Sequence, residues 1–110
     1  AWLVKDAEIT IDLEKPIEIS SVAVGSMENQ GSGIYYPTKV YVAVSMDGKK
    51  YTKVGEIERD FQNAGYVGLM DFKVDFELQK VRFVRIKAQN LGHPPKGGDA
   101  WMFLDEIVVE

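Results

Sequence analysis

Cysteine is absent from the 110-residue chain. This excludes disulfides, thiolate metal sites and a cysteine nucleophile, but not secretion, because a domain of this size can be secreted without a disulfide. No apolar run approaches the roughly 20 residues that a membrane helix needs. The opening Ala1–Asp6 has no basic segment ahead of an apolar one, so we expect no signal peptide there. The abrupt start, and a strand pattern that runs to Glu110, predict that residues 1–110 are one domain, the C-terminal fragment of a larger chain.

Basic residues are outnumbered by acidic ones. The chain has 13 Lys and Arg against 17 Asp and Glu, a net charge of −4. This balance disfavours a surface for nucleic acid or for an anionic membrane, so we expect neither partner. A membrane-inserting tip at Ile34-Tyr35 is an alternative, and the acidic charge disfavours it.

Groups suited to catalysis are few. His93 is the only histidine and stands in a loop rich in Gly and Pro. A catalytic histidine needs an acid or base partner that sequence does not reveal, so we interpret His93 as a solvated or ligand-contacting residue. Asp105 and Glu106 are neighbours on a strand and point to opposite faces, so they cannot form a glycosidase pair. We expect them in a structural ion pair with Arg82 or Arg85, and we predict no catalytic residue.

The clearest positive signal is a β-hairpin over residues 37–54. Valines alternate with other side chains from Val40 to Ser45, the period-two pattern of a strand with one buried face. Asp47-Gly48 supplies the positive backbone angles of a tight turn. Tyr51 begins the return strand. The rest of the chain is organised around this pair.

Further alternating stretches predict more short strands. They span residues 9–13, 17–24, 70–78, 84–88 and 103–109, and the apolar side chains from Met70 to Leu78 alternate without a fault. Glu14–Pro16 has the composition of a turn. A phase slip at Ser20-Ser21 predicts a bulge, and Asp105, on the buried parity of its strand, indicates an edge or a bulge. No window keeps helical spacing for ten residues. Seven strands of this kind predict an all-β fold, an antiparallel β-sandwich or jelly roll.

Three long loops combine aromatic and polar side chains. Sugars present apolar ring faces edged with hydroxyls, so a sugar site needs exposed aromatic rings beside polar groups. Loops on a rigid sandwich are a common place for such a site. We predict ligand contacts from Glu28, Asn29, Tyr35, Arg59, Phe61, Gln62, Tyr66, His93 and Trp101. The alternative for the aromatic rings is packing in the core or the loop, which is favoured for Tyr36 and Trp101 and weighs equally for Tyr35, Phe61 and Tyr66.

Several stretches resemble the coagulation-factor-type C, or discoidin, domain, a group that includes carbohydrate-binding module family 32. They are Asp12-Leu13 after its strand, IEISSVAV (17–24), YPTKVYVAVSMDGKKYTKV (36–54), VRFVRIKAQN (81–90) and AWMFLDEIVV (100–109). The similarity covers nearly the whole chain. NQGSGIYYP (29–37) and the Gly-Gly shortly before Ala100-Trp101 resemble the version at the C-terminus of bacterial family 20 β-N-acetylhexosaminidases, the chitobiase-like enzymes.

The resemblance implies a jelly-roll sandwich that binds ligands on loops at one end. It implies a non-catalytic, weakly carbohydrate-binding module of a secreted, periplasmic or cell-surface glycoside hydrolase, with a glycan of the N-acetylhexosamine or galactose type as partner. Hydrolysis would belong to the parent catalytic domain. The alternative is a structural domain that packs on that catalytic domain and binds no sugar.

The resemblance also bears on calcium. Glu106 matches a carboxylate that the closing strand of the family often gives to a structural calcium ion. In the family, an Asp-Gly loop in a segment upstream of Trp2 helps to bind this ion, and this sequence lacks that segment. One carboxylate falls far short of the roughly six to eight oxygens that calcium prefers. We therefore expect no cofactor, with Glu106 as the one residue that points to a metal.

Overall fold

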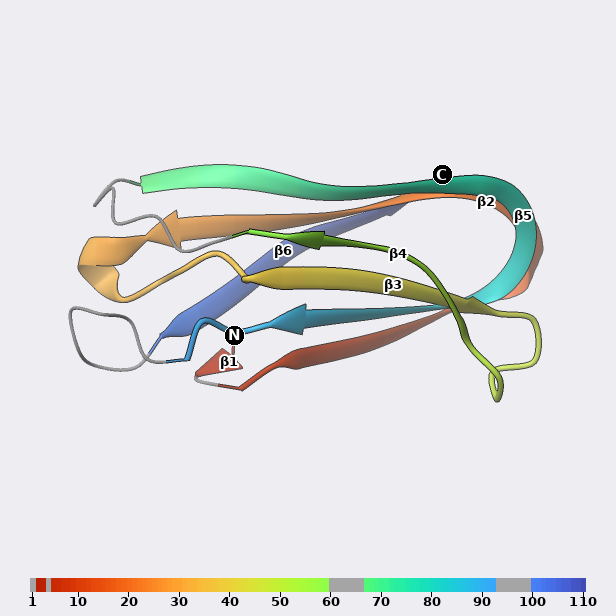
Figure 1. The fold of residues 1–110 in the computed structure, drawn as a ribbon, viewed down its shortest axis with the longest axis horizontal. Helices are drawn as coiled ribbons and strands as arrows, with labels where there is room; N and C mark the ends of the chain where they lie inside the picture. Colours follow the sequence, from red (N-terminus) through yellow and green to blue (C-terminus); the bar gives the residue numbers. More distant parts are fainter. Residues whose placement is uncertain (1, 4, 60–66, 93–99) are drawn as a thin grey trace.

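The regular structure of the chain is almost entirely antiparallel β. A computed structural model describes residues 2–3, 5–59, 67–92 and 100–110 (Figure 1). They form six strands and one short 3₁₀ helix: β1 (Trp2–Leu3), β2 (Ala7–Asn29), η1 (Gln30–Ser32), β3 (Lys39–Ser45), β4 (Thr52–Glu58), β5 (Val67–Gln89) and β6 (Trp101–Val109). The hydrogen-bonded order is β1-β6-β2-β5-β3-β4. The predicted all-β class is confirmed.

Two long strands build both layers of the sandwich. β2 and β5 each have 23 residues and pair with each other on both sides of a sharp bend (Figure 1). Before the bend in β2, residues 7–12 join the end of β5, β3 and β4 in the first layer. After it, residues 17–29 join the start of β5, β6 and β1 in the second layer. Four of the seven predicted strands are therefore halves of two continuous ones.

The bend has a specific cause in the side chains. Asp12 lies opposite Phe83 and Ile17 opposite Val81, so four residues of β2 face the single residue Arg82. The Asp12 carboxylate accepts hydrogen bonds from the Glu14 N–H at 2.8 Å and from Arg82 Nε at 2.9 Å. Glu14 has φ 72°, a left-handed conformation. The predicted turn at 14–16 is therefore an irregularity within one strand, fixed by Asp12.

Asp12 makes the bend sensitive to acid. The Arg82 guanidinium and then the Glu14 N–H lower the pKa of Asp12 below its ordinary value. Because the pKa of Asp12 is lower in the folded state, the Asp12 carboxylate stabilises the fold above about pH 4. This contribution is lost as the pH falls through the folded-state pKa. We expect Asp12→Asn to reduce the fall of the urea midpoint between pH 5 and pH 3. Asp71→Asn, an exposed change on the second layer, should keep the wild-type slope, and an unchanged slope in Asp12→Asn would contradict the assignment.

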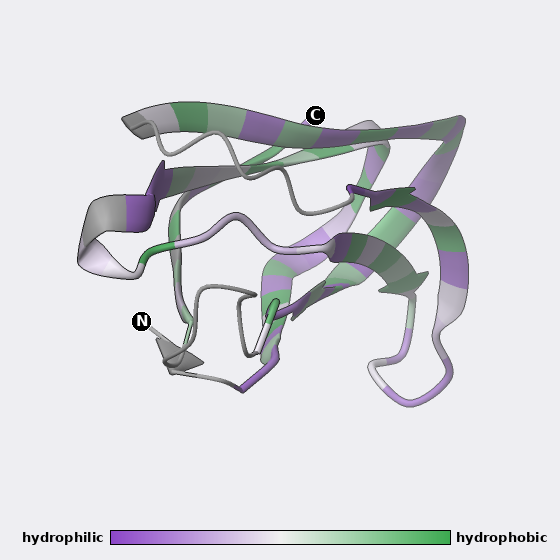
Figure 2. Ribbon diagram, turned by 60° about the vertical axis from the view of Figure 1, so that its left-hand side comes forward, coloured by the Kyte–Doolittle hydropathy of each residue, from purple (hydrophilic) through white to green (hydrophobic). Residues whose placement is uncertain are grey.

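The core lies between the layers, as the alternation predicts. Strands show alternating apolar and polar bands when the molecule is coloured by hydropathy (Figure 2). The fully or nearly fully buried residues include Val22, Val24, Val40, Val42, Val44, Phe72, Val74, Val84 and Ile86. Leu78 is an exception, exposed at 63% although its parity predicts burial. Ile19 pairs with Gln79 and Ser21 with Asp75, so β5 has extra residues at this point and its alternation shifts.

The register of the strands tests three predicted features: two bulges and one tight turn. The shift between Ile19 and Ser21 confirms the bulge at Ser20-Ser21, with the extra residues on β5. Gly25 pairs with Glu106 and Ser26 with Leu104, which leaves Asp105 as a bulge in β6, also as predicted. The hairpin between β3 and β4 is confirmed, but its turn is not tight: residues 46–51 connect the strands, and Gly48 has φ 77°.

Candidate functional site

The long loops leave the sandwich at one end. Asn29 pairs with Val67, and Lys39 pairs with both Glu58 and Gln89. The segments that follow Asn29, Glu58 and Gln89 therefore start at the same end of the strands, at the left of Figure 1. The prediction that the three loops leave from one end of the sandwich is therefore confirmed at their described starting points. We call residues 28–36, 59, 90–92 and 100–101 the loop end.

Backbone hydrogen bonds hold this end together. Asn29 and Ile34 exchange two N–H···O bonds of 2.9 Å each around η1, and Asn29 Oδ1 accepts from the Ser32 N–H at 3.3 Å. Gly33 closes the turn with φ 76°. The Trp101 N–H donates to Gly33 O and the Tyr35 N–H donates to Trp101 O, both at 2.9 Å. The start of β6 is thus fixed to the η1 turn.

Asn90 makes hydrogen bonds with residues on both sides of the last loop. Its own N–H donates to Asp6 Oδ1 at 2.9 Å, and its side-chain Nδ2 donates to Ala100 O at 3.3 Å. Its Oδ1 accepts from the Gly92 N–H at 2.8 Å. The Ala100 N–H in turn donates to Gly92 O at 2.8 Å. Residues 92 and 100 are therefore held side by side.

Two of the predicted contact residues are interior. Glu28 is 3% exposed, and its Oε2 accepts from the Tyr36 N–H at 3.4 Å. Tyr35 is 5% exposed. The expectation that their side chains meet a ligand at the surface is therefore corrected: Glu28 satisfies a buried backbone donor, and Tyr35 packs inside, as Tyr36 was expected to do.

Of the described candidates, Trp101 is exposed and Arg59 is half-buried. The Arg59 guanidinium lies 5.0 Å from the centre of the Tyr36 ring, which makes a T-shaped contact with Phe72 of the core at 6.0 Å between ring centres. Trp101 is 40% exposed, against the favoured expectation that it packs. An exposed indole on a hydrogen-bonded backbone offers a flat apolar surface to a ligand ring.

Of the remaining candidates, one makes a hydrogen bond within the protein and the others lie outside the described residues. Asn29 is half-buried, and its side-chain oxygen caps η1. The loop end therefore brings together the five described candidates, of which Trp101 is exposed and Asn29 and Arg59 are half-buried. Outside the described residues lie Phe61, Gln62, Tyr66 and His93.

A known family of protein domains matches almost the whole chain. The model of the F5/8 type C domain family matches residues 1–107. The chain belongs to this family. A comparison with curated protein sequences found no match.

Solved structures share the fold of this F5/8 type C domain. The C-terminal domain of a chitobiase from Bacteroides fragilis has a TM-score of 0.60 at 19% identity, covering 96% of this chain and 63% of that one. CpGH89CBM32-5 from Clostridium perfringens, in complex with GalNAc-β-1,3-galactose, has a TM-score of 0.58 at 24% identity, covering 93% of this chain and 63% of that one. CBM32-3 from a family 31 glycoside hydrolase of Clostridium perfringens has a TM-score of 0.50 at 21% identity, covering 74% of this chain and 52% of that one. This chain thus spans less than two thirds of each of them.

The two arginines that were expected to pair with Asp105 or Glu106 have other partners. Arg82 pairs with Asp12, and Arg85 Nε lies 3.5 Å from Glu8 Oε1, so neither forms the predicted ion pair with Glu106. The side chain of Asp105 lies outside the described ones. Glu106 is exposed on β6, opposite Gly25. Among the residues that the structure describes, no group of three or more His, Cys, Asp or Glu could hold a metal ion.

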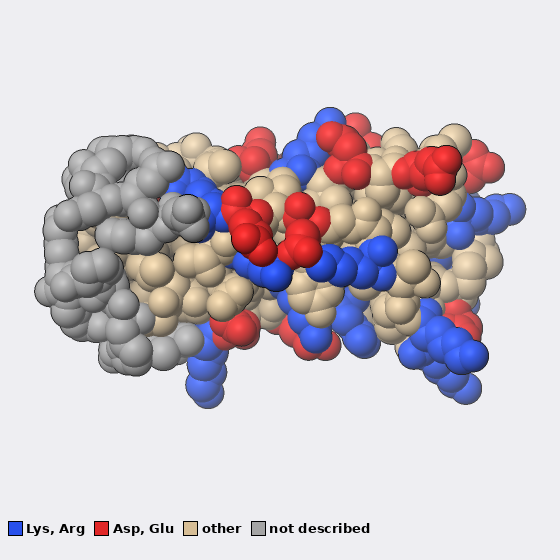
Figure 3. Space-filling view, in the orientation of Figure 1, with Lys and Arg blue, Asp and Glu red and all other residues tan. Residues whose placement is uncertain are grey.

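The described part of this F5/8 type C domain contains no helix that is long and apolar enough to cross a membrane. Acidic and basic side chains alternate over the face shown in Figure 3.

Sequence reasoning missed a hollow on the outer face of the first layer, where Tyr41, Tyr51, Lys53, Arg85 and Lys87 meet. The signal was present in the strand parity, because Tyr41, Arg85 and Lys87 alternate with buried residues, but parity alone does not reveal which strands are neighbours.

Proposed function

We propose that this F5/8 type C domain is a non-catalytic carbohydrate-binding module that binds a glycan weakly at the loop end. Its partner would be a sugar of the N-acetylhexosamine or galactose type. The parent protein would be a secreted, periplasmic or cell-surface glycoside hydrolase of the β-N-acetylhexosaminidase, or chitobiase, type. Catalysis would belong to the parent's catalytic domain.

Trp101 is the observation that carries this proposal. Its indole is 40% exposed, while its N–H and C=O are both used in 2.9 Å backbone bonds to Gly33 and Tyr35. A rigid aromatic surface can stack on a sugar ring without first being ordered, which reduces the entropic cost of binding. Arg59, held against the Tyr36 ring, would supply hydrogen-bond donors for sugar hydroxyls.

The likeness to known proteins supports the same proposal. One structural neighbour is a domain of a chitobiase, and another was determined in complex with GalNAc-β-1,3-galactose. These neighbours share the fold of this chain at identities below 25%.

Replacing Trp101 with alanine tests the loop end directly. We expect N-acetylglucosamine or galactose at millimolar concentration to shift backbone amide NMR signals of Asn29–Ile34 and Ala100-Trp101 in the wild-type chain. Trp101→Ala should raise the Kd at least about tenfold, or ~1.4 kcal/mol, because the stacking surface is lost. Leu78→Ala, another exposed apolar residue, should leave the Kd unchanged.

Two outcomes would contradict the proposal in different ways. If neither sugar shifts any loop-end signal, the domain is better explained as a structural one that packs on its parent catalytic domain. If the chain alone hydrolyses a chromogenic hexosaminide, the non-catalytic assignment is wrong.

A further inference from the structure

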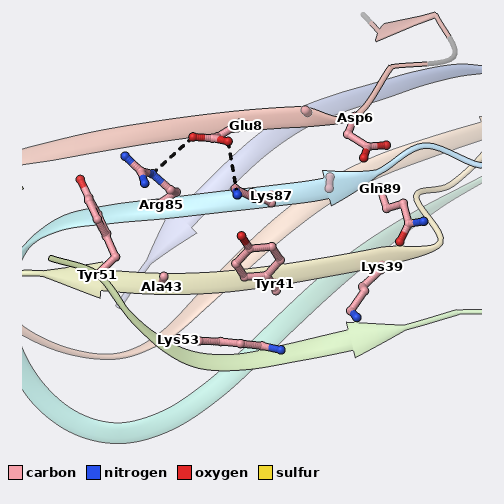
Figure 4. A pocket seen from close by; sticks show the side chains of 12 residues that line it. Asp6, Glu8, Lys39, Tyr41, Ala43, Tyr51, Lys53, Arg85, Lys87 and Gln89 are labelled. Carbon is pink, nitrogen blue, oxygen red and sulfur yellow. Dashed lines mark ion pairs between the residues drawn. The ribbon is translucent and has the colours of Figure 1, made fainter. Parts of the chain in front are cut away.

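A concave surface lies on the outer face of the first layer, away from the loop end. It is a hollow of about 700 Å³, within the usual range of about 300–1,000 Å³ for small-molecule sites. Side chains from four strands line it, with Tyr41 of β3, Lys53 of β4, Arg85 of β5 and Glu8 of β2 among them (Figure 4). We call it the first-layer hollow.

The register explains the shape of the first-layer hollow. Ala43 pairs with Lys53 on one side and with Arg85 on the other. Its methyl group is too short to fill the space between these longer neighbours, and it lies between the Tyr41 and Tyr51 side chains in Figure 4. The hollow therefore has a small apolar floor, two aromatic walls and basic side chains around it.

The tyrosine rings hold the basic groups in place. The Arg85 guanidinium lies 4.0 Å from the centre of the Tyr51 ring. The Lys53 and Lys87 ammonium groups lie 5.6 and 5.5 Å from the centre of the Tyr41 ring. These are cation–π distances, so aromatic contacts hold three cations from two strands beside the tyrosine rings that line the hollow.

The charges in the hollow favour an anion. Among the described residues, four basic side chains and two acidic ones line it, although the chain as a whole has a net charge of −4. Glu8 is shared at 3.5 Å between Arg85 and Lys87, and its side chain is 52% exposed. A hydrogen bond with Tyr41 and then the charge of Glu8 raise the pKa of Lys87, so Lys87 is cationic at neutral pH. Such long, solvent-exposed ion pairs are weak and can yield to an incoming anion.

The residues that surround the basic groups limit the class of anion. Lys39 and Lys53 pair with Glu56 of β4, and Glu8 of β2 lies on the other side of the basic groups. A polyanion such as a nucleic acid would therefore meet carboxylates on both sides. A ligand with one or two negative charges and an apolar face fits the tyrosine walls and the three cations together. Acidic sugars, which bear a carboxylate or a sulfate on a ring with apolar faces, have this chemistry.

We propose that the first-layer hollow is a binding site for an acidic saccharide, such as a uronic acid or a sulfated sugar, and is separate from the loop end. The carboxylate or sulfate would accept hydrogen bonds from Arg85, Lys53 and Lys87. The sugar ring would lie over Ala43 and against the Tyr41 and Tyr51 side chains. This site does not depend on the function proposed for the loop end.

A pair of matched ligands tests the charge requirement. We expect methyl β-D-glucuronide to shift the NMR signals of Tyr41, Ala43, Tyr51 and Arg85 saturably. Methyl β-D-glucoside, which lacks only the carboxylate, should bind at least about tenfold more weakly. Raising NaCl from about 0.05 to 0.5 M should weaken the glucuronide and not the glucoside. N-acetylglucosamine 6-sulfate beside N-acetylglucosamine tests whether a sulfate serves in place of the carboxylate.

Variants locate the site. Arg85→Gln and, separately, Lys53→Gln should each raise the Kd for the glucuronide at least about fivefold. Lys53 lies on the edge strand and is exposed, so its variant provides a second test if Arg85→Gln folds poorly. Lys73→Gln, an exposed change on the second layer, should have no effect. Trp101→Ala should leave glucuronide binding intact, which separates this site from the loop end.

Three results would overturn the proposal. Equal NMR shifts with the glucoside and the glucuronide would mean that the cations of the hollow do not contribute to binding. Equal shifts with acetate would mean that the hollow binds any small anion. Shifts by an acidic peptide such as tetraglutamate, without shifts by either acidic sugar, would identify a protein partner instead.

Discussion

Phe72→Ala will lower the free energy of unfolding by about 3–5 kcal/mol, the usual cost of removing a buried phenylalanine side chain. Phe72 is fully buried in β5 and contacts the Tyr36 ring edge to face, with 64° between the ring planes. Tyr36 in turn packs against Arg59, and its N–H donates to Glu28. The cavity would therefore open where the core supports the loop end.

Urea unfolding at neutral pH measures this effect, and Phe72→Leu is the matched control. Leucine keeps most of the apolar volume, so its cost should stay below about 1.5 kcal/mol. A loss of less than about 1 kcal/mol in Phe72→Ala would contradict the view that this ring links the core to the loop end. A loss in the expected range with altered amide signals at Tyr36 would support it.

The architecture was predictable because strand parity is a local property. Val40, Val42 and Val44 alternate strictly, and all three are buried. The bulge at Asp105 was predictable for the same reason, since a polar residue on the buried parity needs a shift in the register. Where one face of a strand is buried, the sequence of that strand specifies which face.

Continuity of the strands was not predictable in the same way. Glu14, Lys15 and Pro16 have the composition of a turn between two hairpin strands. In the structure the chain stays paired on both sides of them, because Asp12 binds both the Glu14 N–H and Arg82 from 70 residues away in the sequence. Such a long-range contact has no local signal.

Loop composition predicted the location of the candidate site better than the role of each side chain. Glu28 and Tyr35 belong to a polar, aromatic loop, which suggests exposure. A buried backbone donor at Tyr36 needs an acceptor, and Glu28 provides it from the interior. Trp101 precedes a strand, which suggests packing, yet the bond of its N–H to Gly33 fixes it where it is 40% exposed.

Gly55→Ala will destabilise the fold by about 1–3 kcal/mol, although alanine is normally the better residue in a strand. Gly55 pairs with the buried Val42, and a Cβ at Gly55 would lie 2.6 Å from Cγ1 of Val74 in the other layer. Valine has no flexible end that can move away. The edge strand β4 can therefore approach the second layer this closely only because residue 55 has no side chain.

A double-mutant cycle with Val74→Ala separates this clash from a general weakness of β4. Val74→Ala alone should cost about 1.5–3 kcal/mol, but it removes the atom that the new Cβ would meet. The double variant should therefore be more stable than the sum of the two single effects by about 1 kcal/mol. Gly55→Ala combined with Val81→Ala, a buried valine near the bend, should be additive within about 0.5 kcal/mol. Additivity with both partners would mean that the close contact between Gly55 and Val74 does not set the spacing of the layers.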